Sequence, residues 1–379
     1  RDGLDVAGNN CTFVNVTLSN CNATHDGGAV YVKGNNSLFN NVTSLHNHAE
    51  RGGSSFIDGN NVVVINSDLD NNTAEIRGGG LDVAGDNCTF VNVTLSNCNA
   101  TKEGGAVYIR GNENVFENVT SVNNHAYLGG STYVAGDDNV VKNCTLVGNT
   151  ADYGGGAIAI EGSNSNFTGN NISRNSAYMG GAIYIEGDNS LFTYNNITFN
   201  EAHNSEEFPL YSSGGAMAIQ GANTNFTHNN ISSNLADETG GAMVCYGENL
   251  YMEDIYAFNN TAENGGFAQI MYANDLIIKN STFYSNHATG DIDRDRGEGG
   301  AIHVSYSENI DVQGNFTYNT ATNGSAIYVQ DSTLRVHDSS FFDNQAKSYL
   351  LIIDYDRWNS TANCTVKGVC NCSCNCSSH

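Results

Sequence analysis

The stretch GGAIYIEGDNSLFTYNNITFNEA, from Gly180 to Ala202, decides the fold of this chain because variants of it recur along almost the whole sequence. Each copy has a Gly-Gly pair, an alternating apolar stretch, a Phe and then Asn-x-Ala. The pair, or its degenerate form, begins at Gly27, Gly52, Gly78, Gly104, Gly129, Gly155, Gly180, Gly214, Gly240, Gly265, Gly299 and Gly324. The spacings are 25 or 26 residues, apart from two of 34. Such a period in a strand-like sequence is typical of a solenoid whose units bury a core only by stacking.

Each repeat contains rows of residues that are expected to point into a shared core. Counted from the first glycine, position 6 is a β-branched aliphatic residue in nearly every copy, such as Ile109, Ile160 and Ile185. Position 13 is a Phe in many copies, and a third short strand follows it, as in Asn196–Phe199. Three strands and three corners per turn predict a parallel β-helix of about 14 coils, each of about 25 residues.

The Asn of the Asn-x-Ala segment recurs at the same corner of successive coils. These residues are Asn47, Asn72, Asn124, Asn149, Asn175, Asn200, Asn234 and Asn260, with Asn319 and Asn344 further on. Coils lie about 4.8 Å apart, so stacked Asn amides can donate and accept hydrogen bonds along the stack. We predict a structural asparagine ladder rather than a catalytic row.

The composition excludes several classes of function. The net charge of -25, with only 15 Lys and Arg, argues against nucleic acid and against anionic membrane surfaces. No run of 18 apolar residues is present, so we expect no membrane insertion by this segment. Arg1-Asp2-Gly3 already lies in a repeat, and we expect the chain to be part of a longer protein.

Recurrent Asn-x-Ser/Thr acceptors predict an extracellular or cell-surface location and a glycosylated surface. Candidate acceptors are Asn15, Asn41, Asn92, Asn118, Asn171, Asn196, Asn230 and Asn280.

The cysteines suggest a boundary near the C-terminus. We predict a solenoid over 1–353 and a Cys-rich tail over 354–379. The tail holds Cys364, Cys370, Cys372, Cys374 and Cys376. Outside the cell this cluster favours disulfides, with metal chelation as the alternative; the usual Cys-x-x-Cys zinc spacing is absent, and we predict no metal site.

The repeats resemble two known groups of surface proteins. The pairing of GGAIYI-type segments with FxxN, as in 192–195 and 226–229, is similar to the polymorphic outer-membrane proteins of chlamydiae. The Asn-Thr-Ala endings at 72–74, 149–151 and 260–262 look more like the adhesin-like proteins of methanogenic archaea. The resemblance covers residues 1 to about 346 and implies a right-handed, single-stranded parallel β-helix of the pectin-lyase kind, displayed at the cell surface for adhesion.

An enzyme must be weighed, because polysaccharide lyases and hydrolases share this fold. The best acidic groups are Asp68 with Asp70 and the segment 290–298, where Asp alternates with Arg. No His lies in a recognisable nucleophile context, and Lys and Arg are too few to supply a groove for acidic polysaccharide. The sequence therefore predicts no catalytic residues, no cofactor and no enzyme, with a polysaccharide lyase or hydrolase as the alternative.

Two features suggest ligand binding. Position 5 points outward and carries aromatic residues that include Tyr31, Tyr108 and Tyr184. We expect these rings to be exposed, so that they either bind a ligand or stack on one another and stiffen the sheet. Two nine-residue insertions, in His203–Ser213 and Thr289–Glu298, leave the same corner three coils apart. We predict that they flank a shallow groove contacted by Phe208, Tyr211, Asp293 and Arg294.

These features favour a non-catalytic cell-surface adhesin or display module. Its expected partners are surface glycans or proteins of another cell. A self-assembling surface filament, formed by end-to-end association, is a further alternative.

Overall fold

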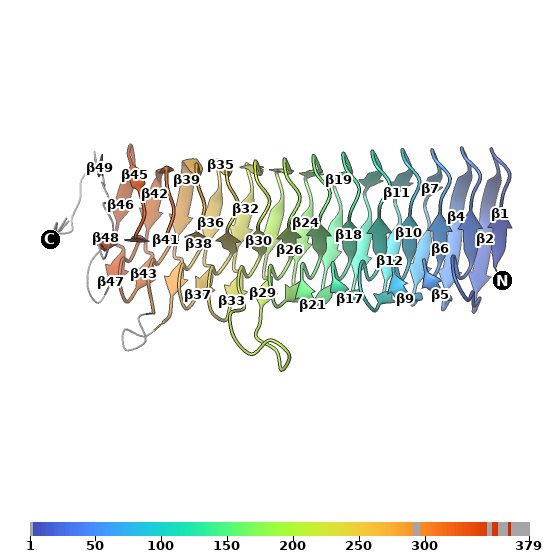
Figure 1. Ribbon diagram of the computed structural model, residues 1–379, viewed down its shortest axis with the longest axis horizontal. Helices are drawn as coiled ribbons and strands as arrows, with labels where there is room; N and C mark the ends of the chain where they lie inside the picture. Colours follow the sequence, from blue (N-terminus) through green and yellow to red (C-terminus); the bar gives the residue numbers. More distant parts are fainter. Residues whose placement is uncertain (1–2, 291–295, 347–350, 355–362, 365–379) are drawn as a thin grey trace. The chain divides into compact units, whose positions relative to one another are not determined.

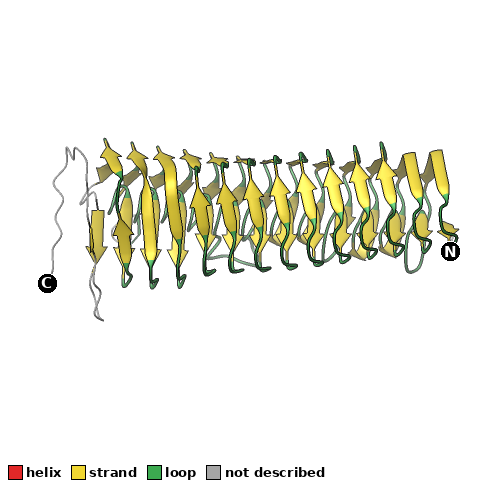
Figure 2. Ribbon diagram, turned by 90° about the horizontal axis from the view of Figure 1, so that it is seen from above, coloured by secondary structure: helices red, strands yellow, loops and turns green. Residues whose placement is uncertain are grey.

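The computed structural model describes residues 3–290, 296–346, 351–354 and 363–364, with the backbone alone for the last two ranges. The chain divides into two compact units, which are Arg1–Ala177 with Ala182–Leu191, and Tyr178–Gly181 with Phe192–His379. Both consist of coils of short parallel strands (Figure 1). The chain is a right-handed, all-β solenoid of about 13 turns, close to the predicted number, and the described residues include no helix (Figure 2). The predicted fold class is confirmed.

In unit 1 the strands of successive coils form three parallel sheets. Sheet A contains β1 (Leu4–Val6), β3 (Val30–Val32), β6 (Ser55–Ile57), β10 (Leu81–Val83), β14 (Val107–Ile109), β18 (Thr132–Val134), β22 (Ile158–Ile160) and β26 (Ile183–Ile185). Sheet B contains β2 (Thr12–Ser19), β4 (Leu38–Leu45), β7 (Val63–Ile65), β8 (Asp68–Asp70), β11 (Thr89–Val91), β12 (Thr94–Ser96), β15 (Val115–Glu117), β16 (Thr120–Val122), β19 (Val140–Lys142), β20 (Thr145–Val147), β23 (Asn166–Thr168) and β24 (Asn171–Ser173). Sheet C contains β5 (His48–Arg51), β9 (Thr73–Arg77), β13 (Asn99–Ala100), β17 (His125–Leu128), β21 (Thr150–Gly154) and β25 (Ser176–Ala177).

Unit 2 repeats the same three sheets, and the division between the units falls within β27 (Leu191–Thr193). Sheet A contains β30 (Met217–Ile219), β34 (Met243–Cys245), β38 (Ala268–Met271), β41 (Ile302–Ser305), β44 (Ile327–Gln330) and β48 (Leu351–Asp354). Sheet B contains β28 (Asn196–Thr198), β31 (Asn225–Thr227), β32 (Asn230–Ser232), β35 (Tyr251–Glu253), β36 (Tyr256–Phe258), β39 (Ile277–Tyr284), β42 (Ile310–Thr317), β45 (Leu334–Val336), β46 (Ser340–Phe342) and β49 (Asn363–Cys364). Sheet C contains β29 (Glu201–Ala202), β33 (Leu235–Ala236), β37 (Thr261–Ala262), β40 (His287–Ala288), β43 (Thr320–Ala321) and β47 (Gln345–Ala346).

The Gly-Gly pair makes the sharp corner between sheets C and A. Gly104 has a φ of 63°, a left-handed conformation that costs glycine nothing, and an added Cβ would lie 2.1 Å from the carbonyl oxygen of Val107. An added Cβ on Gly105 would lie 2.1 Å from the carbonyl oxygen of Gly130 in the next coil. The first glycine is therefore needed for conformation and the second for close coil-to-coil contact.

The interior is filled by the predicted rows of aliphatic and aromatic side chains. Ile109 and Ile185 are fully buried, and the rings of Phe90 and Phe116 stack with their centroids 4.5 Å apart. In unit 2 the Phe283 and Phe316 rings stack in the same way at 4.7 Å. Each coil buries its apolar side chains against identical positions of the next, which favours folding by stacking.

A ladder of buried Asn side chains runs along the corner before sheet C in both units. In unit 1 the Oδ1 of Asn149 accepts hydrogen bonds from the backbone N–H and side-chain amide of Asn124, at 3.0 and 2.9 Å. The Nδ2 of Asn149 donates to Asn175 Oδ1 at 3.0 Å and to the Ser121 carbonyl at 3.1 Å. In unit 2 the corresponding amide bonds join Asn200, Asn234, Asn260, Asn286, Asn319 and Asn344.

Six cysteines of the described residues are free, and four of them, Cys88, Cys98, Cys144 and Cys245, are buried. They pack as small apolar side chains, as expected for residues in equivalent positions of separate coils. The predicted disulfides of the tail involve side chains outside the described residues.

Replacing Asn149 by Ala tests the ladder. The variant leaves the backbone N–H of Asn124 buried without an acceptor and removes the two hydrogen bonds that the Asn149 amide donates, and we expect the free energy of unfolding to fall by roughly 3 kcal/mol. Urea denaturation followed by circular dichroism measures this. Ser163→Ala, at a half-exposed corner, is the control, and equal stability of the two variants would contradict a structural role for the ladder.

Candidate functional site

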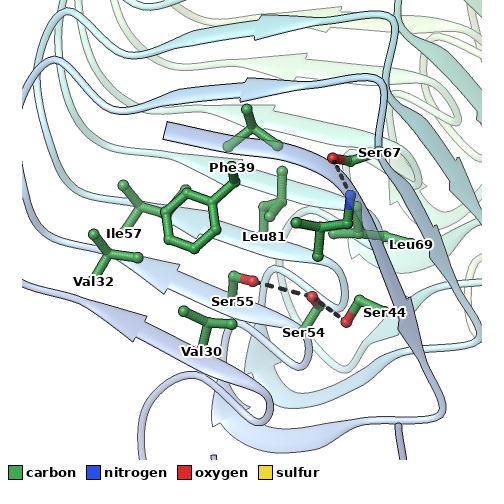
Figure 3. A pocket seen from close by; sticks show the side chains of 12 residues that line it. Val30, Val32, Phe39, Ser44, Ser54, Ser55, Ile57, Ser67, Leu69 and Leu81 are labelled. Atoms are coloured by element: carbon green, nitrogen blue, oxygen red, sulfur yellow. Dashed lines mark hydrogen bonds between the residues drawn. The ribbon is translucent and has the colours of Figure 1, made fainter. Parts of the chain in front are cut away.

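The interior of unit 1 contains two small cavities, and neither has room for a sugar ring. One cavity, shown in Figure 3, is lined by residues that include Val30, Ile57 and Leu81 and the hydrogen-bonded row of Ser44, Ser54 and Ser55. Each cavity has a volume of about 20 Å³. This is close to the space that one water molecule needs. Neither of these two cavities can therefore hold a ligand larger than water.

The aromatic residues at position 5 lie on the outer face of sheet A in unit 1. Tyr31 is half-buried, whereas Tyr108 and Tyr184 are only 8% and 4% exposed, so the expectation that these rings are exposed is wrong. The rings of Tyr108 and Tyr133 stack 5.5 Å apart, and the Tyr184 hydroxyl donates to Glu186 at 2.8 Å. These contacts, together with long side chains from the flanking corners, cover the row.

Four cations cover these rings and define a cation–aromatic face of unit 1. Lys33 lies over the ring of Tyr31, Arg51 and Arg110 lie over that of Phe56, and Arg77 lies over that of Tyr108. The distances to the ring centroids are 4.5, 5.2, 5.3 and 4.4 Å. The small number of Lys and Arg in the sequence does not exclude a cationic surface, because more than half of those described in unit 1 gather here.

Asp82 lies at the centre of the cation–aromatic face, where the neighbouring coils have an aromatic residue. Its side chain is fully buried, with Oδ2 2.8 Å from Arg77 Nε and Oδ1 3.9 Å from Arg110 Nε. Burial raises the pKa of this carboxyl, and the two guanidinium groups oppose that rise. Asp82 Oδ1 accepts no hydrogen bond from the described residues, and Arg110 retains free donors on the solvent side.

The two insertions both belong to unit 2, and the described residues include the predicted contact residues of the first insertion only. Phe208 folds back onto the ring of Tyr178 with the centroids 4.8 Å apart. Tyr211 is 71% exposed. Asp293 and Arg294 lie outside the described residues. In Figure 1 the first insertion projects as a long loop beyond β29 and β33.

The bases of the two insertions meet on one carboxylate, that of Glu238. Asn204 at the start of the first insertion donates to Glu238 at 3.4 Å, and Arg296 at the end of the second lies 3.5 Å from it. Arg296 also pairs with Glu263. His203 binds Glu201 at 2.8 Å and Asp237 at 3.3 Å. Burial lowers the pKa of His203, but these two carboxylates outweigh it, so the net shift is upward.

An exposed row of aromatic side chains, which we call the aromatic stripe, lies on the outer face of sheet B in unit 2. Its members are Tyr256, Phe258, Tyr284, Tyr318 and Phe342, from β36, β39 and β46 and from the corner after β42. Successive ring centroids are 6.2, 5.5, 5.4 and 6.0 Å apart. Tyr256, Tyr318 and Phe342 are 47%, 42% and 53% exposed.

The corresponding outward positions in the third strands of unit 1 hold small, aliphatic or acidic residues and no ring, as in Ser96, Val122 and Asp70. The stripe is therefore not required by the coil itself. The sequence interpretation missed it because it examined only position 5. Aligning the third strand of each repeat, where Phe258 and Tyr284 are 26 residues apart, would have revealed it.

A second polar cluster lies on the outer face of sheet A in unit 2. His303 is 4% exposed and pairs in register with Gln269 on one side and Tyr328 on the other. Neither ring nitrogen of His303 has a hydrogen-bond partner among the described residues, and Glu298 lies 3.8 Å from Nε2. Burial lowers the pKa of His303 to about 4, so the imidazole is neutral near pH 7.

The predicted glycosylation acceptors lie on the surface. Asn15, Asn41, Asn92, Asn118, Asn171, Asn196 and Asn280 are exposed, and Asn230 is partly exposed. Within the described ranges, no group of three His, Cys, Asp or Glu side chains is arranged to hold a metal ion. None of the described residues forms a helix of the length and hydrophobicity that a membrane crossing needs.

Comparison with known proteins supports the fold. Residues 79–248 match the family model described as a right handed beta helix region. No curated protein matches the chain. An alginate lyase of the PL6 type, described in complex with a trisaccharide, has 14% identity and a TM-score of 0.52, with 92% of this chain and 82% of that chain covered.

Two further solved structures are similar over most of the chain. The alginate lyase AlyF-OU02, in complex with G6, has 14% identity and a TM-score of 0.46, with 90% of this chain and 79% of that chain covered. A mutant tailspike protein of E. coli bacteriophage HK620, in complex with a hexasaccharide, has 11% identity and a TM-score of 0.41, with 88% and 72% covered.

The prediction that the chain is not an enzyme is contradicted by its likeness to the PL6-type alginate lyase. A solenoid composes a catalytic site from neighbouring coils, about 25 residues apart, so the absence of a local motif does not exclude catalysis. The argument that cations are too few also fails, because Lys33, Arg51, Arg77 and Arg110 gather on one face.

The buried imidazole of His303 predicts a loss of stability in acid. Its pKa is about 6.5 in an unfolded chain but about 4 here, so protonation favours the unfolded state and stability is lost as the pH falls from about 6.5 to 4. The loss is about 3 kcal/mol. We expect His303→Gln to reduce the difference in unfolding free energy between pH 7 and pH 4.5, whereas the exposed control His287→Gln leaves it unchanged. An identical pH dependence in both variants would contradict a buried neutral His303.

Proposed function

We propose that this protein is an extracellular, cell-surface β-helix that binds glycans, and that unit 2 binds neutral sugar rings along the aromatic stripe. The observation that carries the proposal is the stripe itself, a continuous row of five rings of which Tyr256, Tyr318 and Phe342 are 42–53% exposed. Exposed aromatic rows of this size are rare on soluble proteins without a binding role. The apolar faces of aromatic rings suit the C–H faces of sugars.

The charge of unit 2 favours a neutral ligand. Its described residues include three Lys or Arg and seventeen Asp or Glu, which disfavours an anionic polymer and a second copy of this acidic chain. Polar side chains beside the stripe, such as Asn315 and Ser340, offer hydrogen bonds to hydroxyl groups; Ser340 Oγ already donates to Asn315 Oδ1 at 2.7 Å. A polar rim around an apolar centre is the usual form of a specific recognition surface.

Adhesion is the role that best fits such a surface. The repeats resemble adhesin-like proteins, and the exposed Asn-x-Ser/Thr acceptors support a glycosylated chain outside the cell. The alginate lyase of similar fold is described in complex with a trisaccharide, and we carry oligosaccharide binding over to this chain as part of the proposal. The expected partners are glycans of another cell or of the surrounding matrix.

The predicted groove between the insertions remains a separate proposal. Phe208, Tyr211, Asp293 and Arg294 would contact a ligand there, and the shared anchor on Glu238 keeps the two loop bases near one another. Self-association end to end is likewise a proposal.

The cation–aromatic face supports a second candidate function, which is binding and cleavage of an acidic polysaccharide by unit 1. Arg110 is 38% exposed, and its closest acidic partner, Asp82, is 3.9 Å away, so its guanidinium group has donors available for a carboxylate of a sugar acid. Arginine binds carboxylates with two parallel hydrogen bonds, which suits such a substrate.

Removing aromatic rings from the stripe tests the main proposal. In the double variant Tyr284→Thr and Phe342→Ser, both positions take residue types found at the same place in other coils, so the coil should fold normally. We expect binding to an array of neutral oligosaccharides to weaken at least tenfold, since the stacking of a sugar on each aromatic ring contributes on the order of 1 kcal/mol. Tyr251→Asn, outside the stripe, is the control. Undiminished binding by the double variant would refute the stripe as the site.

Arg110 provides the test of the second candidate. We expect Arg110→Ala to weaken binding of acidic polysaccharides severalfold and to lower any release of unsaturated sugars, measured by ultraviolet absorbance, because the exposed guanidinium is lost. Binding of neutral glycans should not change. Lys102→Ala, an exposed cation outside the face, is the control. If both variants behave like the wild type, unit 1 does not use this face.

A further inference from the structure

Two tyrosines of unit 2 form an exposed pair at a corner away from the aromatic stripe. Tyr272 follows β38 and Tyr306 follows β41, at the corner between sheets A and B. Their rings stack with centroids 5.3 Å apart and planes 11° apart. Tyr272 is 62% exposed and Tyr306 is 48% exposed. One face of the Tyr272 ring is covered by Tyr306, so an exposure this high leaves the opposite face open.

The backbone at both tyrosines has an unfavourable conformation. Tyr272 has a φ of 55° and Tyr306 a φ of 49°, in the left-handed region that favours Gly and Asn. For other residues this conformation costs about 1 kcal/mol or more. Tyr194, Phe199, Tyr211 and Tyr318 also have positive φ, and all six are 42–71% exposed.

In unit 1 the corner positions with positive φ are occupied mostly by polar residues. Its non-glycine residues with positive φ, among those that the structure describes, are mostly Asn and include no Tyr, Phe or Trp. Exposed aromatic rings at strained corners contribute little to the core and cost backbone energy. Strain of this kind points to a role in binding rather than in folding.

The corner of the tyrosine pair also differs from that of the two preceding coils in unit 2. There a glycine packs directly against the coil before it, and an added Cβ on Gly247 would lie 2.2 Å from the Gly221 carbonyl oxygen. At Tyr272 and in the next coil, this corner has an aromatic ring in place of the glycine that makes the close backbone contact. Polar groups lie beside it, since Asn274 donates to Glu248 Oε1 at 3.4 Å.

We propose that Tyr272 and Tyr306 form a second binding site for a neutral sugar ring, separate from the aromatic stripe. The sugar stacks on the open face of Tyr272, and its hydroxyl groups donate to Glu248 and bond with Asn274. A neutral pyranose fits because the nearby charges are carboxylates, which repel an anionic ligand and accept hydrogen bonds from hydroxyl groups. This inference rests on the proposed glycan binding.

The two sites lie at opposite ends of β39. Tyr272 precedes β39, whereas Tyr284 of the stripe is its last residue. The eight residues of Ile277–Tyr284 span up to roughly 26 Å at about 3.3 Å per residue. Unit 2 therefore holds two glycan chains at once, so that one molecule links neighbouring chains of a matrix or of a cell surface and gains affinity from the double attachment.

The experiment counts sugars bound per chain. Neutral disaccharides of glucose, mannose and galactose, chosen so that one sugar does not bridge both sites, are first screened on an array with the whole chain, and the strongest binder of these is titrated by calorimetry. We expect a stoichiometry of two for the wild type. It falls to one in the double variant Tyr272→Asn and Tyr306→Asn, to one in the stripe variant, and to none in the combination. The Asn variant should also melt at an equal or higher temperature, because Asn tolerates the left-handed conformation.

Binding to a surface densely coated with the same sugar gives a second readout. Loss of either site should weaken it at least tenfold without changing the affinity of the remaining site. A stoichiometry of one that the Asn variant keeps, or two sugars retained by the Asn variant, would overturn the inference while leaving the stripe intact. No binding by the wild type would overturn the proposed function and the inference together. Binding lost only in the Asn variant would support the pair and refute the stripe.

Discussion

Hydrogen bonding between buried Asn amides of successive coils is the interaction on which the rest of this solenoid depends. The ladder fixes the register of one coil on the next, because an amide such as that of Asn149 finds its donors and acceptors only when equivalent positions are stacked. Once the register is fixed, each apolar side chain meets the same position of the next coil, as Phe90 meets Phe116. A shift of one residue would bury polar side chains and leave the amides without partners.

The same constraint frees the outer faces to vary. Residues that point outward have no effect on the register. The coils of units 1 and 2 therefore have the same interior pattern but differ in surface chemistry. Unit 1 carries cations over aromatic rings, with Asp82 buried among them. Unit 2 carries exposed rings at positions where unit 1 has residues such as Ser96 and Val122. Differences of this kind, on a scaffold that does not need them, are where function is expected.

Much of the fold could be predicted from the sequence, because the period, the Phe row and the Asn-x-Ala corner are local patterns. Less of the site could be predicted. Tyr108 and Tyr184 were expected to be exposed, but both are buried. Alternation within a strand predicts which side chains point outward. It does not predict that a long side chain such as that of Arg77, at the end of β9, covers the aromatic row. The aromatic stripe was missed because its members come from four coils, and its continuity exists only after stacking.

A catalytic site on a solenoid would be hidden from sequence reasoning for the same reason. In a globular enzyme a short motif often holds two catalytic groups, whereas here the groups that meet, such as Arg77 with Asp82 and Arg110, come from consecutive coils and look unrelated in the chain. Total composition misleads as well, since 15 cations in 379 residues appear sparse until four of them converge. For a solenoid, a surface must therefore be judged by what each row presents after stacking, and that judgement separates the cationic face of unit 1 from the aromatic faces of unit 2.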